Sequence, residues 1–138
     1  LHTEPVYVVV RGALAEALRS DPTPERLSAL DRAIRDCPDA SLAGLLLVKG
    51  DTLLRTAQAR EDYVRASWPY LRVAVHRQAS PEAADGLFGG GTALHRAGLS
   101  DDAARLFEQA VAHPLAREQT RTSATDALQR LRRAGGGG

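Results

Sequence analysis

Apolar residues recur every three or four positions in seven successive segments of this chain, and short turns rich in proline, glycine and acidic residues separate these segments. This spacing places the apolar side chains of each segment on one face of an α-helix. The third helix is expected over about residues 41–57, the fifth over 80–97 and the seventh over about 115–133. Turns of two to five residues make each helix antiparallel to the previous one. The chain is therefore predicted to be all-α, with about seven antiparallel helices.

The choice of apolar residues also favours helices over sheets. Alanine (24 residues) and leucine (19 residues) dominate, whereas valine and isoleucine together contribute 10. Alanine and leucine lose little side-chain freedom in a helix, and sheets prefer β-branched and aromatic residues. An all-β sandwich or barrel is excluded on this ground. A strand through residues 7–10 is an alternative only to the first helix, which is expected to begin near Pro5.

Charge and cysteine content exclude several classes of function. The formal net charge is +1, with 17 arginines and one lysine against 17 acidic residues. Proteins that bind the phosphate backbone carry a strong basic excess, so we expect no nucleic-acid partner. The single cysteine, Cys37, allows neither an internal disulfide nor a cysteine metal cluster. The longest apolar runs, 6–10 and 45–48, are much shorter than the roughly 20 residues of a membrane-spanning helix, and we expect no transmembrane segment.

The chain begins at Leu1 and contains no methionine. We therefore expect it to be a processed protein or a segment of a longer one. No signal peptide is visible in the sequence. The sequence leaves the location open between the cytoplasm and, if an export signal has been removed, the periplasm or cell envelope.

A regular series of small and large residues extends from residue 84 to residue 117. Two glycines allow a paired helix to approach closely, a third glycine favours the end of the first helix, and a small residue stands where the two helices cross. A leucine fills the gap between the two helices, a phenylalanine is the knob that packs into the facing helix, and a proline stops the second helix. In chain order the residues are Gly90, Gly91, Leu94, Gly98, Ala103, Phe107, Ala110 and Pro114.

This series resembles the tetratricopeptide repeat, a helix pair of about 34 residues. Leu87 replaces the usual tryptophan, and Pro114 comes one residue early. Two weaker copies precede the series, so the resemblance implies a right-handed α-solenoid of three helix pairs with a C-terminal capping helix. The implied single domain covers 1–134, with pairs at about 5–39, 41–79 and 81–114, the capping helix at 115–133 and a flexible glycine tail at 135–138.

Two details of the resemblance concern its subgroup and its second pair. The final pair and cap are similar in rhythm to the tetratricopeptide domains of bacterial cell-envelope proteins. The second pair contains about five extra residues near 58–63. These residues either lengthen a helix or form a loop.

The resemblance implies a non-catalytic function as a protein–protein interaction or scaffold module. In such a solenoid the first helix of each pair lines the concave surface, where a peptide or helix of a partner protein binds. Phe88 is the expected anchor, because an aromatic side chain on this surface should have little packing within the chain. The alternative is a helical accessory or self-association domain, including a homo-oligomer, of a larger protein whose remainder carries the activity. The predicted partner-binding residues are Arg11, Asp51, Phe88, Thr92 and His95.

No motif in the sequence has the spacing of an enzyme or cofactor site. The four histidines lack metal-ligand spacing. Cys37 has acidic neighbours, which disfavour a reactive thiolate. The glycine-rich stretch 86–91 lacks the lysine and hydroxyl residue of a phosphate-binding loop. We therefore expect no catalytic, cofactor-binding or metal-binding residue, and no enzyme activity.

Two surfaces have more than one interpretation. Trp68 either packs within the second pair or forms an exposed anchor for a partner. The arginines of the last helix either complement its dipole or form a patch for anionic ligands. They are Arg117, Arg121, Arg130, Arg132 and Arg133.

Overall fold

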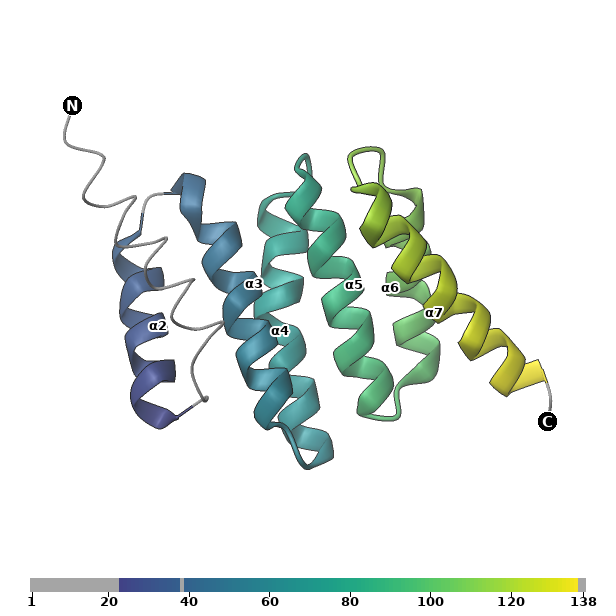
Figure 1. Ribbon diagram of the computed structural model, residues 1–138, viewed down its shortest axis with the longest axis horizontal. Coiled ribbons are helices and arrows are strands. Elements are labelled where there is room, and N and C mark those ends of the chain that lie inside the picture. The colour runs from purple at the N-terminus through teal and green to yellow at the C-terminus, as the bar shows by residue number, and fades with distance from the viewer. Residues whose placement is uncertain (1–22, 38, 137–138) are drawn as a thin grey trace.

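The computed structural model describes residues 23–37 and 39–136, which form six α-helices and contain no β-strand (Figure 1). The all-α prediction is confirmed for these residues. The helix expected from Pro5, its strand alternative and Arg11 lie outside the described residues. No described helix has the length and apolar character needed to cross a membrane. The helices are α2 (Pro24–Asp36), α3 (Asp39–Thr56), α4 (Arg60–His76), α5 (Pro81–Arg96), α6 (Ser100–Ala112) and α7 (Glu118–Gly136).

The helices follow one another in chain order along the long axis of the molecule (Figure 1). In this view α3, α5 and α7 lie in front, and α4 and α6 lie behind them. Each helix packs on the next one in the sequence, and α5 also contacts α3 and α7. The described helices therefore pack only on helices that are one or two positions away in the chain.

The second predicted pair contains a turn followed by a complete helix. Residues 57–59 form the turn, and α4 begins at Arg60. The Asp62 carboxylate accepts hydrogen bonds from the backbone N–H groups of Gln58 and Ala59, at 3.2 and 3.1 Å. These bonds satisfy donors that the first turn of a helix leaves free. The extra residues are thus divided between the turn and the start of α4, which continues through the buried Pro69 without a break.

α5 ends at a glycine with left-handed backbone geometry. Gly98 has a φ of +84°, a value that costs glycine little because it has no Cβ. The N–H of Gly98 donates to the His95 carbonyl at 3.0 Å, and the N–H of Leu99 donates to the Leu94 carbonyl at 2.9 Å. This pair of bonds is a Schellman motif. The helix-ending role predicted for Gly98 is confirmed.

The ring of Tyr70 on α4 lies between glycines of α3 and α5. A Cβ added to Gly50 would lie 2.7 Å from this ring, and a Cβ added to Gly89 would lie closer still. A Cβ on Gly86 would lie 2.5 Å from the Tyr70 carbonyl oxygen. These distances are shorter than any normal contact, so α3, α4 and α5 can pack this closely only because the three positions lack side chains. Tyr70 is 3% exposed, and its hydroxyl donates a hydrogen bond to the carboxylate of Asp51 on α3.

Phe107 forms the corresponding contact between α5 and α6. Its side chain is 2% exposed, and a Cβ on Gly91 would lie 2.7 Å from its ring. The close approach predicted at Gly91 and the role of Phe107 as a packed knob are confirmed. The same core contains Leu87, Ala103, Ala110, Ala124 and Leu128.

α7 is attached to both α5 and α6 by polar contacts. The Arg121 guanidinium donates to the carbonyl of Val111 at 3.2 Å and to that of His113 at 3.0 Å. It thereby satisfies carbonyls at the end of α6 that have no partner within the helix. Asp85 on α5 accepts hydrogen bonds from the Arg117 guanidinium and the Thr120 hydroxyl.

The capping helix begins later than expected. It starts at Glu118, whereas the sequence placed its start at 115. The His113 ring explains the difference, because its Nδ1 accepts the N–H of Leu115 at 3.1 Å and its Nε2 lies 2.7 Å from the Gln78 carbonyl. Because Nδ1 accepts a hydrogen bond, Nε2 carries the proton and donates to the Gln78 carbonyl. These two bonds of the ring hold residues 113–117 in a turn.

Replacing Gly89 tests the packing around Tyr70. Gly89→Ala is expected to lower the free energy of unfolding by about 1–3 kcal/mol, because the added methyl group overlaps the Tyr70 ring. Urea denaturation followed by circular dichroism measures the change. The matched control is Gly135→Ala, where an added Cβ meets no atom within 4 Å and no loss is expected. If Gly89→Ala lowers the free energy of unfolding by the same amount in a Tyr70→Leu variant, overlap with the Tyr70 ring is not the cause of the loss.

Candidate functional site

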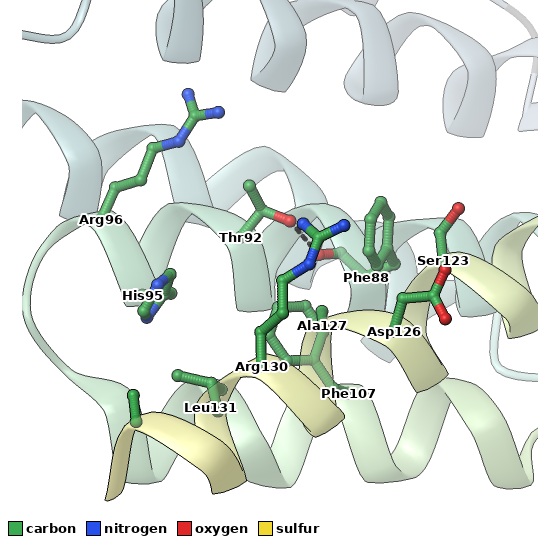
Figure 2. Close-up of a pocket in the computed structure, with 11 residues that line it drawn as sticks. Phe88, Thr92, His95, Arg96, Phe107, Ser123, Asp126, Ala127, Arg130 and Leu131 are labelled. Atoms are coloured by element: carbon green, nitrogen blue, oxygen red, sulfur yellow. Dashed lines mark hydrogen bonds between the residues drawn. The ribbon is translucent and has the colours of Figure 1, made fainter. Parts of the chain in front are cut away.

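Three of the five predicted partner-binding residues line one cavity. Phe88, Thr92 and His95 of α5 face α7 across an open space of about 600 Å³ (Figure 2). We call it the α5–α7 cavity and define it by these residues together with Phe107 of α6 and Asp126 and Arg130 of α7. Of the other two predicted residues, Asp51 lies on α3, away from the cavity, and Arg11 lies outside the described residues.

The α5 wall of the cavity follows from helical spacing. Phe88, Thr92 and His95 lie four and three residues apart, so their side chains share one face of α5. The Thr92 hydroxyl donates to the Phe88 carbonyl at 3.0 Å, as the dashed line in Figure 2 marks. This bond fixes the Thr92 rotamer and leaves its oxygen able to accept a hydrogen bond. His95 is exposed at the edge of the cavity.

Phe88 is part of the core as well as part of the cavity. Its ring lies 5.7 Å from the Phe107 ring, centroid to centroid, at an interplanar angle of 43°. Tilted aromatic pairs of this kind attract each other. The expectation that Phe88 has little packing within the chain is therefore wrong. The half-buried ring forms the floor of the cavity, and its position is fixed before any partner binds.

The α7 wall was not anticipated from the sequence. Ser123, Ala127 and Arg130 line the cavity at the same four- and three-residue spacing as the α5 residues. Figure 2 shows the Arg130 side chain extending from α7 toward α5. The available signal was the apolar pattern of the last helix. Ala124 and Leu128 mark the buried face of this helix. Ser123, Ala127 and Arg130 lie next to that face, where they line the cavity.

The rim of the cavity carries more positive than negative charge. Arg96 and Arg130 are exposed, and in the described part of the chain neither forms an ion pair. Asp126, also on the rim, is the single acidic residue among the described residues of the lining. The site combines an aromatic floor with two unneutralised guanidinium groups, so it favours a ligand with an apolar and an anionic part.

Asp51 has a hydrogen-bond partner within the chain. It accepts a hydrogen bond from the Tyr70 hydroxyl. Burial of the Asp51 carboxylate raises its pKa, although Asp51 as a residue is exposed; the bond from Tyr70 and the charge of Arg55 oppose this rise. Burial is also the main reason that the pKa of Tyr70 is raised, followed by the hydrogen bond and the charge of Asp51.

The described residues contain no group of three or more histidine, cysteine or acidic side chains placed to hold a metal ion. Cys37 packs beside Leu30 and Val48, and its thiol lies 3.4 Å from the Ile34 carbonyl. The chemistry that the α5–α7 cavity offers is recognition by packing, hydrogen bonding and charge.

The Tyr70–Asp51 pair predicts a loss of stability at alkaline pH. Because the pKa of Tyr70 is higher in the folded state, the unfolded chain releases this proton first as pH rises above about 10. Stability is then lost by up to about 1.4 kcal/mol per pH unit. Tyr70→Phe is expected to remove this part of the slope, measured by urea denaturation at a series of pH values.

Asp51→Asn separates the effect of burial on the pKa of Tyr70 from the effect of the Asp51 charge. It removes the negative charge but keeps a hydrogen-bond acceptor, and burial, the larger cause, remains. Most of the alkaline slope should therefore survive in this variant. If the stability of Tyr70→Phe falls with rising pH as steeply as that of the unmodified chain, Tyr70 is not the group responsible for the alkaline loss of stability.

No protein-family model, curated protein or solved structure matches the chain. The resemblance of residues 84–117 to the tetratricopeptide repeat therefore depends on the spacing of its residues. The function is inferred from the geometry of the α5–α7 cavity.

Proposed function

We propose that this chain is a non-catalytic interaction module of the tetratricopeptide-like type, in which the α5–α7 cavity holds a peptide or helix of a partner protein. The observation that carries the proposal is the convergence of Phe88, Thr92 and His95 on one open cavity. Their spacing in the sequence places them on one face of α5, and that face lines the cavity.

The contacts of the helices are those expected of a solenoid, which the resemblance makes right-handed. α3 and α5 are the first helices of successive pairs in this scheme and α7 is the capping helix, and these three are the ones that meet as second neighbours. Gly91 against Phe107 and the turn at Gly98 supply the close approach and the chain reversal that each unit requires. A stack of this kind leaves the first helices available to a ligand along one surface.

The cavity favours a partner segment of mixed character. An apolar side chain of the partner would pack on the Phe88 ring, which the core already holds in place. A carboxylate beside it would lie near Arg96 and Arg130, where charge-assisted hydrogen bonds are stronger than neutral ones. Thr92 would accept a backbone N–H and set the register of the segment. Because the site is preformed, little entropy is lost in ordering it.

Binding variants test this function. Peptides selected from a randomised display library against the unmodified chain should bind at least about tenfold more weakly to Phe88→Ala and to Arg130→Ala. Fluorescence anisotropy measures the affinity, and amide chemical shifts locate the bound peptide. Phe88→Leu keeps an apolar side chain at the floor of the cavity and should therefore keep the fold. Weaker peptide binding by this variant would then reflect the loss of the aromatic contact and not a loss of folding.

Arg105→Ala is the matched control for charge. Arg105 lies on α6, exposed and paired with Asp102 at 3.8 Å, and it does not line the cavity. It should bind the selected peptides as the unmodified chain does. Selected peptides whose largest amide shifts lie outside α5, α6 and α7, or that bind equally well to Phe88→Ala, would exclude the cavity as the site.

A second function, self-association, is favoured by a different observation. Trp68 and Val75 on α4 are 60% and 61% exposed, and Leu71 lies between them at helical spacing. Trp68 is therefore an exposed side chain and not a core residue of the second pair. Exposed large apolar residues aligned on one helix are typical of an interface.

Sedimentation velocity tests self-association. A dimer through this face of α4 should dissociate at lower concentrations when Trp68 is changed to Ser, because an aromatic anchor is lost. Leu115→Ser, at another exposed apolar residue, is the control. A monomer at every concentration would exclude this function.

A further inference from the structure

A second cavity, of about 700 Å³, lies among α2, α3 and α4 and is lined mainly by charged side chains. It shares no residue with the α5–α7 cavity. We call it the basic cavity. Its charged residues are Glu25, Asp31, Arg32, Arg35, Lys49 and Arg72.

Arginines of two helices line the basic cavity. Ser28, Arg32 and Arg35 lie four and three residues apart, so they form one face of α2. α4 contributes Arg72. All three guanidinium groups belong to exposed residues, and none of them forms an ion pair within the described part of the chain.

The charges of the basic cavity do not balance. Lys49 pairs with Asp31 at 2.7 Å, and this pair is neutral. Among the described lining residues, Glu25 is the one remaining acidic residue, against Arg32, Arg35 and Arg72. The described lining therefore has a net charge of +2, because three positive charges exceed one negative charge by two.

We propose that the basic cavity binds a carboxylate-rich segment of a partner protein. Like charges gathered around one space repel each other, and a bound anion relieves this repulsion. A guanidinium group binds a carboxylate through two parallel hydrogen bonds, which lysine cannot match. The segment would interact with Arg32 and Arg35 on α2 and with Arg72 on α4.

The shape and surroundings of the basic cavity favour a protein segment over other anions. Ile34 supplies an apolar surface in the lining and packs on the core formed by Leu46 and Val73. A flat bilayer cannot enter a concave space between helices. Among the described residues, no aromatic side chain lines the basic cavity, so this part of the lining lacks the stacking surface typical of sites for single-stranded nucleic acids.

An oligoglutamate peptide with a fluorescent label is the probe. Anisotropy titration at low salt should give saturable binding to the unmodified chain, weakened by added salt. Arg35→Ala and Arg72→Ala should each reduce the affinity about two- to fivefold, as expected for exposed charge pairs, and the double variant more. Circular dichroism melts verify that the variants fold.

Arg105→Ala is the matched control, since it removes the same charge from a distant helix. Binding to it should equal binding to the unmodified chain, and an equal loss there would overturn the proposal by showing a general charge effect. Binding of Phe88→Ala should also be unchanged. This result separates the basic cavity from the α5–α7 cavity, so the two proposals can fail independently.

Three further ligands complete the experiment. An oligolysine peptide should not bind. Phosphatidylserine vesicles and single-stranded DNA should bind more weakly than oligoglutamate. If either binds more tightly, and loses that affinity in the Arg35→Ala, Arg72→Ala double variant, the proposed class of ligand is wrong.

Discussion

The packing of the Tyr70 ring between Gly50 and Gly89 determines how the helices of this protein can be arranged. α3, α4 and α5 meet at this ring, and any side chain at the two glycines would overlap it. The hydroxyl at the far end of the ring reaches Asp51, so a buried polar group is satisfied at no loss of packing. The middle of the structure is thus specified by steric fit and one hydrogen bond.

Both cavities depend on this arrangement. α5 is placed by Gly86 and Gly89 on the side of α4 and by Gly91 on the side of α6, so its remaining face, with Phe88 and His95, is left for α7 and a ligand. α7 stays close because Arg121 and Thr120 anchor it to α6 and α5. On the other side, α4 brings Arg72 to the arginines of α2. One set of glycine contacts therefore positions two chemically different surfaces.

The sequence was sufficient for the features that depend on local spacing. The all-α class, the turn at Gly98 and the contact of Gly91 with Phe107 follow from periodicity and from residue size. The sequence alone did not predict the features that depend on where distant helices meet. One of these features is the hydrogen bond that the Asp51 carboxylate accepts from Tyr70, 19 positions along the chain. Arg130 and Arg72 join their cavities for the same reason, because spacing within a helix does not tell which other helix faces it.

The restriction of helix packing to first and second neighbours has a consequence for how the molecule forms and moves. Contacts between residues close in sequence require little loop closure, which favours rapid folding. The same restriction means that a change in the position of one helix is passed on through its immediate neighbours. α5 and α7 are second neighbours in contact, and the α5–α7 cavity lies between them. A segment bound in this cavity would contact both helices at once, so its affinity would depend on how α5 and α7 are placed relative to each other.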